Sequence, residues 1–290
     1  MAAEHAVIST RGRIARGSLG VYGALIYLFL FAPIVLLVLF SFNANRYGTF
    51  PITGWTLEWY RAAISDYQIH DALSTTLRIA FEVTIISTVV GTAAAFPLVR
   101  SRLPFRNGIR IVVVLPIMIP GLLIGVSLLV LFTQTLHQEL STQTAVIGQA
   151  VYTTPFVILL VAARLQGFDR RLESAASDLG ANTFNRLRLV VVPLLLPAII
   201  AGALFAFTLS LDEFIITYFL IGGHNTLPIY IYTQVKFGIT PEVNALAAML
   251  LGASLAILAL AFALPQVIRA LRRGLRHARG RETTLAEGVA

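Results

Sequence analysis

Residues 164–193 read RLQGFDRRLESAASDLGANTFNRLRLVVVP, a charged stretch that lies between two long apolar runs. Residues 171–179 have the composition of a short helix, and Asp169 is a candidate N-cap just before it. Gly180 follows at the position where such a helix would end in a left-handed cap. This basic loop therefore predicts a small helical surface on which a cytoplasmic partner can dock.

Outside this loop, the chain has the composition of a membrane protein. Of its 290 residues, 57% are hydrophobic and 12% are charged, and the mean hydropathy is +0.80. Soluble domains are about 25% charged and about 45–50% apolar, so lipid is the expected solvent. The absence of cysteine excludes disulfides, thiolate metal sites and cysteine nucleophiles.

Six apolar segments are long enough to cross a bilayer, which needs about 20 mostly apolar residues. The fifth segment is long and reads as a broken span, and a miscount there would leave five. The first is too long for a typical signal peptide and has no small-residue cleavage site, so it predicts an uncleaved anchor. The segments are residues 21–42, 73–99, 109–133, 145–165, 190–221 and 244–271.

The basic residues predict the orientation, because short loops rich in Lys and Arg stay in the cytoplasm. The opposite loops hold only Arg46, Arg61 and Lys236. We therefore expect a protein of the bacterial inner membrane that has an even number of spans and both termini in the cytoplasm. No nucleic-acid partner is expected. The residues on the cytoplasmic side are Arg11, Arg13, Arg16, Arg100, Arg102, Arg106, Arg110, Arg164, Arg170, Arg171, Arg186, Arg188, Arg269, Arg272, Arg273, Arg276, Arg279 and Arg281.

These segments divide the chain into five predicted parts. The outer loop carries both tryptophans, Trp55 and Trp59. Indole rings favour the headgroup layer, so residues 55–64 are expected to lie flat on the outer interface, with ligand stacking as the alternative. The parts are a basic tail (1–20), a first transmembrane helix (21–42), the outer loop (43–72), a five-helix transmembrane domain (73–271) and a second basic tail (272–290).

The sequence contains no catalytic motif. Lys236 is the only lysine, and no Gly-x-x-x-x-Gly-Lys-Ser/Thr loop for phosphate is present. The five histidines are scattered, without a His-Glu-x-x-His pair or a Gly-x-Ser-x-Gly elbow. We therefore expect neither an enzyme nor a bound metal or cofactor. Transport, a channel or scaffolding remain as functions.

The basic loop resembles a known family motif. Ser174-Ala-Ala-Ser-Asp-Leu-Gly180, nine further residues and then Val190-Val-Val-Pro193 are similar to the coupling loop of binding-protein-dependent ABC importer permeases. That loop is written Glu-Ala-Ala, three residues, Gly, nine residues, Ile-x-Leu-Pro. Ser174 occupies the family's Glu position here, and Glu173 lies one place earlier, so either side chain is a candidate for the polar contact with the ATPase. An ordinary loop helix that ends in glycine is the alternative.

The resemblance implies a mechanism and partners. The helix of the loop at 166–192 would fit a cleft of a separate ATPase subunit, and closure of two ATPases on ATP would move the loops as levers. A second permease, forming a heterodimer, and an extracytoplasmic binding protein would complete the machine. The residues that the resemblance assigns to ATPase coupling are Glu173, Ser174, Ala175, Ala176, Asp178, Leu179, Gly180, Ala181 and Phe184.

A second resemblance concerns the substrate. Ser210-Leu-Asp-Glu-Phe, Thr226-Leu-Pro-Ile-Tyr230 and Ile239-Thr-Pro-Glu-Val-Asn-Ala245 are similar to the second permease of spermidine/putrescine importers. The resemblance implies a polyamine as the transported solute. Other small amines, amino-acid-like compounds and aminophosphonates are the alternatives within the same subfamily.

Polar residues within the fifth span are candidates for the translocation pathway. Asp212 and Glu213 lie about 20 residues after Pro193, near the outer half of the span. Carboxylates in a membrane usually face a cavity or a partner. Together with Tyr218 they could recognise a cationic substrate or form an outer gate. Contacts with the companion permease, or a helix break at the interface, are the alternatives.

Two further features lie within the spans. Arg78 and Glu82 are four residues apart on one helix face, so an ion pair that faces the helix bundle is expected, with a ligand site as the alternative. Pro116 and Pro120 predict a kink in the third span.

The sequence thus predicts an all-α, polytopic membrane protein with six transmembrane helices and a cytoplasmic coupling helix between spans four and five. Its predicted function is that of a permease subunit of an ATP-driven importer. An ion-coupled secondary transporter or channel is the main rival, and it would need inverted repeats and ion sites in broken helices at the midplane. A membrane-embedded enzyme would need acidic residues or histidines gathered at one interface.

Overall fold

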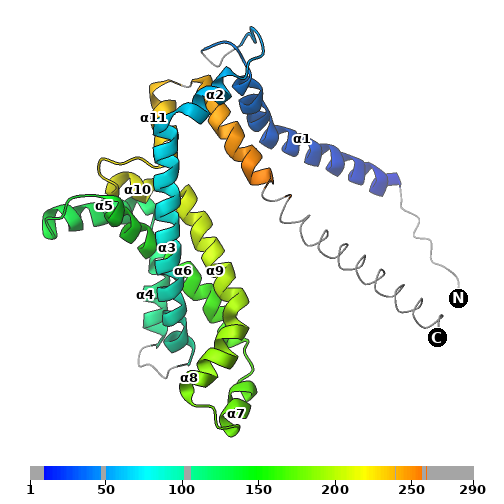
Figure 1. The fold of residues 1–290 in the computed structure, drawn as a ribbon. Coiled ribbons are helices and arrows are strands. Elements are labelled where there is room, and N and C mark those ends of the chain that lie inside the picture. The colour runs from blue at the N-terminus through cyan, green and yellow to red at the C-terminus, as the bar shows by residue number, and fades with distance from the viewer. Residues whose placement is uncertain (1–9, 47–49, 101–105, 239, 257–258, 260–290) are drawn as a thin grey trace, which may run out of the picture. The chain divides into compact units, whose positions relative to one another are not determined.

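The computed structural model describes residues 10–46, 50–100, 106–238, 240–256 and 259, and Figure 1 shows their fold. Among these residues no β-strand forms, apart from an isolated bridge between Asn43 and Trp55. The all-α class is therefore confirmed. The labelled helices are α1 (Thr10–Ser41), α2 (Glu58–Ser65), α3 (Tyr67–Arg100), α4 (Arg106–Met118), α5 (Gly121–Val130), α6 (Thr142–Gln166), α7 (Arg171–Asp178), α8 (Thr183–Arg186), α9 (Val192–Asp212), α10 (Ile215–Leu220) and α11 (Leu227–Phe237), with π-helical turns η1 (Leu131–Thr135) and η2 (Leu187–Val191).

Four helical stretches of the described residues are long and apolar enough to cross a membrane, with mean hydropathies of 1.8 to 2.7. They correspond to the first, second, fourth and fifth predicted spans. The third predicted span is a bent pair of helices, and a count of six is not reached in the described part of the chain. The sixth predicted span begins in the apolar helix Pro241–Ala256, and its remainder, like the C-terminal basic tail, lies outside the described residues. The four stretches are Ser18–Ser41, Tyr67–Arg100, Thr142–Gln166 and Thr183–Asp212.

The chain divides into two compact units. One consists of the described parts of Met1–Ser65 and Gln234–Ala290, and the other is Asp66–Thr233. The second unit contains α3 to α10, which include the coupling loop and the acidic residues of the fifth span. All the predicted site residues therefore lie within one unit.

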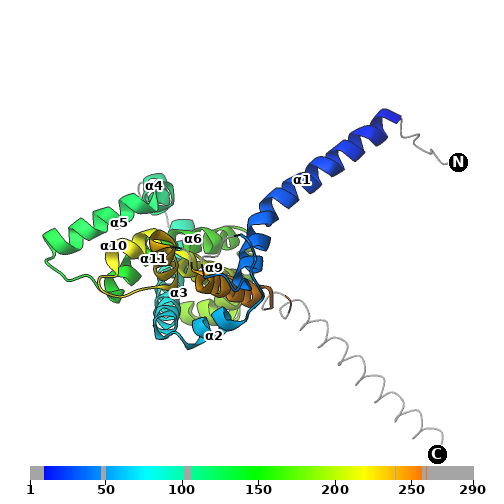
Figure 2. The same cartoon turned by 90° about the horizontal axis from the view of Figure 1, so that it is seen from above.

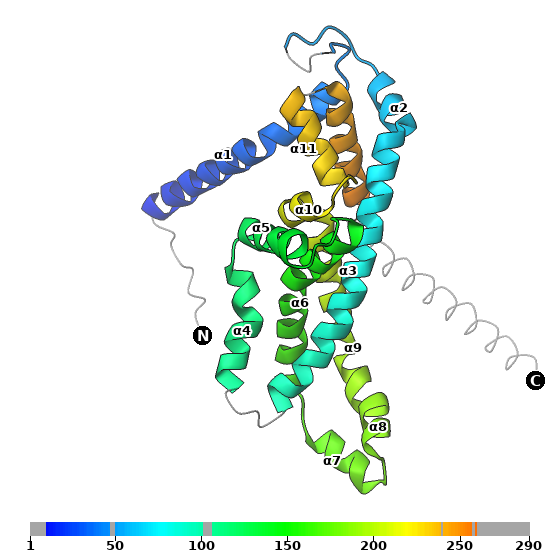
Figure 3. The same ribbon diagram turned by 90° about the vertical axis from the view of Figure 1, so that its left-hand side faces the viewer.

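Helix α6 lies at the centre of the second unit, with α3 and α9 packed against it (Figures 1 and 3). Two glycines allow this close approach. A Cβ atom at Gly91 of α3 would come within 2.8 Å of the Val157 side chain of α6, and one at Gly202 of α9 would come within 3.1 Å of the same side chain. Small residues at helix contacts let backbones approach closely in membrane proteins, and Val157 fills the space that the two glycines leave.

Two buried apolar clusters hold the second unit together. One joins α3, α6, η2 and α9 near the base of the coupling loop, and the other joins α3, α5, α6 and α10. Both ends of the coupling loop therefore emerge from a packed core. The first cluster contains Ala95, Leu98, Val157, Ile158, Val161, Ala162, Leu165, Val191, Leu195 and Ala206.

The third predicted span bends by 99° between α4 and α5, so that α5 runs across α4 (Figures 1 and 2). Pro116 lies inside α4 and Pro120 immediately precedes α5. Pro120 cannot donate a backbone hydrogen bond, and a residue that precedes a proline is disfavoured in the helical conformation. The predicted kink is confirmed, and it is sharp enough to turn one segment into two helices.

In the first unit, the outer loop folds around Asn43, which is fully buried. Its Oδ1 accepts hydrogen bonds from the backbone N–H groups of Asn45 (3.1 Å) and Thr53 (3.2 Å). Its carbonyl accepts one from Nε1 of Trp59 at 2.8 Å. The indole N–H of Trp59 is thus used within the loop, while Trp55 is exposed. That residues 55–64 lie on the outer interface stays a prediction.

Candidate functional site

The coupling loop contains a short helix, α7, at the predicted place. The Asp169 carboxylate accepts a hydrogen bond from the N–H of Arg171 (2.9 Å), although Arg170 is the residue directly before the helix. Asp169 therefore satisfies one of the free N–H groups that every helix N-terminus leaves.

Gly180 ends α7 in the left-handed conformation, with φ of +84°. Its N–H donates to the carbonyl of Ser177 (2.9 Å), and the N–H of Ala181 donates to the carbonyl of Ala176 (3.0 Å). These are the two hydrogen bonds of a Schellman motif. The predicted glycine cap is confirmed.

The chain then enters α8, where the Asn182 side chain accepts a hydrogen bond from the N–H of Asn185 (2.8 Å). Helix α8 continues through η2 into α9, so the turn between α7 and α8 is capped on both sides. Helices α7 and α8 lie together at one end of the second unit (Figure 3).

One face of α7 is apolar and exposed. Leu172, Ala175, Ala176 and Leu179 follow the spacing that places residues on one side of a helix, and we call them the docking stripe. Leu179 is 89% exposed. Phe184 of α8 adds a further apolar side chain that is 65% exposed. The sequence predicted all of these residues for the docking surface except Leu172.

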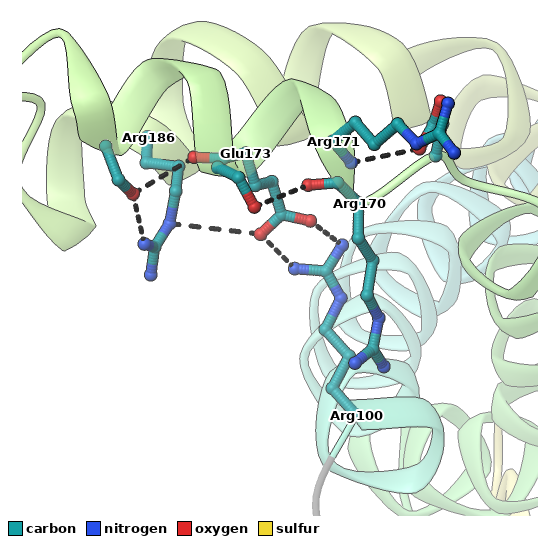
Figure 4. Close-up of polar contacts among 8 residues, drawn as sticks. Arg100, Arg170, Arg171, Glu173 and Arg186 are labelled. Carbon is teal, nitrogen blue, oxygen red and sulfur yellow. Dashed lines mark hydrogen bonds and ion pairs between the residues drawn. The ribbon is translucent and has the colours of Figure 1, made fainter.

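Glu173 of α7 faces its own chain (Figure 4). Glu173 forms two contacts with the Arg100 guanidinium, Nη1 to Oε2 at 2.7 Å and Nη2 to Oε1 at 2.5 Å. Ser174 is exposed, and its hydroxyl lies 3.4 Å from the carbonyl of Arg170. A cavity of about 270 Å³ lies beside these groups, lined by Arg100, Arg170, Glu173, Ser174, Ser177 and Arg186.

The fifth span is broken directly after Asp212, the last residue of α9. Glu213 is extended, and its Oε1 accepts a hydrogen bond from the N–H of Ile216 (2.7 Å) at the start of α10. Asp212 is exposed, and among the described residues its carboxylate has no hydrogen bond or ion pair. The two predicted acids therefore have different surroundings. The Glu213 carboxylate accepts a hydrogen bond from the backbone of its own turn, whereas Asp212 is accessible.

Tyr218 belongs to an aromatic cluster beside this break. Its ring lies 5.5 Å from that of Phe214 and 6.0 Å from that of Tyr232, and the rings of Phe214 and Tyr232 are 4.8 Å apart. Phe214 and Tyr232 are not among the site residues predicted from the sequence. Phe214 could have been found from its spacing of four residues to Tyr218, but Tyr232 arrives on α11 and has no local signal.

Gln149 of α6 bridges the same break and is not among the site residues predicted from the sequence. The side chain is 1% exposed. Its Nε2 donates to Oγ1 of Thr217 at 2.6 Å, and its Oε1 accepts from the Ser210 hydroxyl. One amide thus joins the end of α9 to α10. The only sequence signal for this role is that Gln149 is a lone glutamine within an apolar span.

Arg78 and Glu82 form the predicted ion pair, with 2.9 Å between Nε and Oε1. The prediction that the pair faces the helix bundle was wrong for this chain, because the two side chains are 61% and 39% exposed. Ile79 and Val83, each one residue further along α3, occupy the buried face. The pair therefore lies on the outside of the chain's own bundle.

The family model described as "Binding-protein-dependent transport system inner membrane component" matches residues 87–277. The chain belongs to this family. It is a multi-pass inner-membrane protein and a permease subunit of an ABC importer. The matched region contains the coupling loop and the break in the fifth span.

Curated relatives cover most of the chain. The spermidine/putrescine transport system permease protein PotC of Escherichia coli K12 is 38% identical over 248 residues, which are 84% of this chain and 91% of PotC. The putrescine transport system permease protein PotI of the same strain is 36% identical over 78% of this chain and 83% of PotI. The putative 2-aminoethylphosphonate transport system permease protein PhnV of Salmonella paratyphi A is 29% identical over 86% of this chain and 94% of PhnV.

Solved structures support the fold of the permease. A bacterial ABC transporter involved in the import of alginate aligns with a TM-score of 0.68 at 16% identity, covering 89% of this chain and 98% of that one. The MetNI methionine ABC transporter aligns with a TM-score of 0.56 at 19% identity, covering 70% of this chain and 96% of that one. At these identities the likeness concerns the fold alone.

Proposed function

We propose that this permease forms part of the translocation pathway of an ATP-driven importer for polyamines. The observation that carries the proposal is its similarity, at 38% and 36% identity, to permeases named for spermidine and putrescine transport. The aligned regions include both the coupling loop and the broken fifth span of the family's core. Spermidine or putrescine is accordingly the proposed solute.

The break between α9 and α10 supports a cationic solute. Asp212 offers an accessible carboxylate, and Tyr218 and the neighbouring Phe214 and Tyr232 offer aromatic rings. Carboxylates attract ammonium groups, and ammonium groups also bind over aromatic faces within about 6 Å of the ring centre. We propose that Asp212, Glu213 and Tyr218 line the pathway, with Glu213 acting through the shape of the turn that it caps.

The docking stripe supports the proposal that ATP is hydrolysed by separate subunits. The chain has no phosphate-binding loop, and α7 presents an exposed apolar face between two caps. A short rigid helix of this kind fits a surface cleft of an ATPase subunit. The proposed complex has this permease, a second and different permease, two ATPases and an extracytoplasmic substrate-binding protein.

We further propose that the chain crosses the membrane six times with both termini in the cytoplasm. The proposed parts are the basic tail (1–20), the first helix (21–42), the outer loop (43–72), the importer transmembrane domain (73–271) and the second basic tail (272–290). The distribution of the 22 basic residues supports this orientation, and the family match at 87–277 supports the extent of the importer domain.

An aminophosphonate is the second candidate substrate, because PhnV is 29% identical over 252 residues. Such a compound carries an ammonium group and an anionic phosphonate. An accessible carboxylate such as Asp212 would attract the first and repel the second. The surroundings of the break therefore favour a polyamine over an aminophosphonate.

The test is uptake by the complete transporter reconstituted in vesicles. Labelled spermidine and putrescine should accumulate only with ATP, the ATPase subunits and the binding protein present. Unlabelled polyamines should compete, whereas amino acids and 2-aminoethylphosphonate should not. Uptake without the ATPase subunits would contradict the proposed machine, and competition by 2-aminoethylphosphonate alone would contradict the proposed substrate.

A further inference from the structure

Glu173 lies on a different face of α7 from the docking stripe. It shares its face with Ser177, one helical turn later. Figure 4 shows its carboxylate between the guanidinium groups of Arg100 and Arg186, two residues from other parts of the chain. Arg100 is the last residue of α3, and Arg186 is the last residue of α8. Glu173 therefore connects α7 to its sequence neighbour α8 and to α3, which is far away in sequence.

The contact between Glu173 and Arg100 is closely held. The two side chains are only 15% and 23% exposed. Nη1 of Arg100 donates a charge-assisted hydrogen bond to Oε2 of Glu173 at 2.7 Å, and Nη2 lies 2.5 Å from Oε1 as an ion-pair contact. The Arg100 guanidinium also lies 5.7 Å from the ring centre of Phe96 and 5.5 Å from that of Phe168, distances that allow cation–π attraction to both rings.

Arg186 adds a weaker connection to the same face. Its Nε lies 3.8 Å from Oε2 of Glu173, and its Nη1 donates to the Ser177 hydroxyl at 2.9 Å. That hydroxyl in turn donates to the carbonyl of Glu173 at 3.0 Å. The polar face of α7 is thus tied to α8 as well as to α3.

Helix α7 has few other attachments. It contains eight residues, all of them described, and none is buried. Isolated helices of this length are not stable in water, so α7 needs contacts with the rest of the chain to hold it in place. Its position relative to the membrane helices therefore depends on its caps and on the contacts of Glu173.

We propose that Glu173 is a positioning residue that clasps α7 to the cytoplasmic end of α3 through Arg100, and that it does not contact the ATPase. This inference rests on the proposed function, because it assigns the route by which movement of the ATPase enters the permease. In this proposal the docking stripe, Phe184 and the exposed Ser174 contact the ATPase.

The clasp leads directly into the packed core of the permease. Leu98 and Ala95 lie within one to two turns of Arg100 and are buried against α6 and α9 in the cluster at the base of the loop. Packed interiors transmit displacement instead of absorbing it. A push on the docking stripe is therefore passed to α3, the longest helix of the second unit, as a movement of the whole helix.

The experiment uses four variants. They are Glu173→Gln, Arg100→Gln, the double variant that combines these two, and an exchanged pair that combines Glu173→Arg and Arg100→Glu. Each permease is purified with its partners and reconstituted, and both solute uptake per ATP hydrolysed and the amount of bound ATPase are measured. Each single variant should lower uptake per ATP on the order of tenfold, a size typical of coupling between sites. The double variant should be no worse than either single one, and the exchanged pair should recover uptake.

Arg188→Gln is the matched control, because Arg188 is an exposed arginine in the same loop. It should leave the uptake per ATP hydrolysed unchanged.

ATPase should remain bound in all of these variants. Loss of ATPase from Glu173→Gln but not from Arg100→Gln would overturn the inference, because Glu173 would then be a docking contact. Additive losses in the double variant, or no recovery in the exchanged pair, would also overturn it.

A second measurement does not depend on transport, so it separates this inference from the proposed function. The purified permease alone is treated with chymotrypsin, and cleavage after Phe184 is followed. Glu173→Gln and Arg100→Gln should both raise the cleavage rate several-fold, since local opening governs proteolysis. Unchanged cleavage would overturn the clasp, whereas failure of the wild-type complex to import polyamines would count only against the proposed function.

Discussion

At the residue scale, adjacent polar side chains have different surroundings in this permease. Asp212 and Glu213 are adjacent acids, yet one is accessible and the other accepts a hydrogen bond from its own turn. Glu173 and Ser174 are adjacent at the family's acidic position, yet one faces Arg100 and the other faces outward. Within α7 the difference follows from helix geometry, because successive residues point about 100° apart. At the end of α9 it arises because Glu213 is extended directly after the last helical residue, Asp212.

Gly180→Val should abolish ATP-driven uptake. Nothing lies within 4 Å of a Cβ atom at this position, so the expected effect comes from the backbone φ of +84° and not from a clash. A residue with a Cβ pays about 1–2 kcal/mol in this conformation, and branching at Cβ adds to the strain. The end of α7 and the docking stripe should therefore shift. Uptake in vesicles is the measurement.

Gly180→Asn is the matched control, since asparagine tolerates the left-handed conformation. It should retain most of the uptake. If both variants were inactive, the glycine would be needed for a close approach of the partner and not for its φ.

Asp212→Asn should weaken the uptake of polyamines. The substitution keeps the shape of the side chain and removes its charge, so the apparent KM for spermidine should rise on the order of tenfold, equivalent to about 1.4 kcal/mol. Asp212→Glu keeps the charge and should stay close to the wild type. An unchanged KM in Asp212→Asn would argue against an electrostatic role for this residue.

At the scale of elements, two of the predicted spans are each broken into two helices. The proline pair separates α4 from α5 with a bend of 99°, and α9 ends at Asp212 before α10 begins at Ile215. The first break has a local cause in the missing N–H of Pro120. The second has no proline, and it is held by the Gln149 amide and the Glu213 carboxylate.

Gln149→Leu should lower the stability of this arrangement. The side chain would lose its hydrogen bonds to Thr217 and Ser210, and bonds of this kind in membrane proteins contribute about 1 kcal/mol each. The expected result is a lower free energy of unfolding by about 1–2 kcal/mol. Thermal unfolding of the purified protein in detergent, followed by its helical circular dichroism, measures the change.

Gln143→Leu provides the comparison, because Gln143 is an exposed glutamine near the start of the same helix. It should change stability by less than about 0.5 kcal/mol. Equal effects of the two substitutions would mean that the buried network does not stabilise the break.

At the scale of the whole molecule, the described second unit separates its two candidate sites. Helix α9 has 21 residues, which corresponds to about 30 Å. The coupling loop precedes one end of this helix, and the break with its acids follows the other. The distance matches the thickness of the hydrocarbon core, so the docking surface and the outer part of the pathway are expected on opposite sides of the membrane.

Cysteine labelling tests this orientation without background, because the chain contains no cysteine. His224→Cys, in the exposed loop between α10 and α11, should react with a membrane-impermeant maleimide in intact spheroplasts. Asp178→Cys, at the end of α7, should react only in inside-out vesicles. The reverse pattern would show that the basic loops lie outside the cell, contrary to the proposed topology.

The sequence by itself determined the features that depend on local composition and spacing. Long apolar segments predicted the membrane helices, because burying apolar side chains in lipid requires only enough of them in a row. The glycine at position 180 predicted a helix cap there, because the cap needs a positive φ. The two prolines predicted the bend before α5. The fixed spacing from Ser174 to Pro193 indicated the family.

Only the tertiary structure decided which distant groups meet. Glu173 and Arg100 are 73 positions apart, and Gln149 and Thr217 are 68 apart. The sequence offered no way to choose between Glu173 and Ser174, to place Tyr232 beside Tyr218, or to see that Arg78 and Glu82 face outward. These arrangements depend on how separate segments of the chain pack, and such packing is set by the combined shape of their side chains. That is why the coupling loop could be recognised from its spacing, while the role of its one glutamate could not.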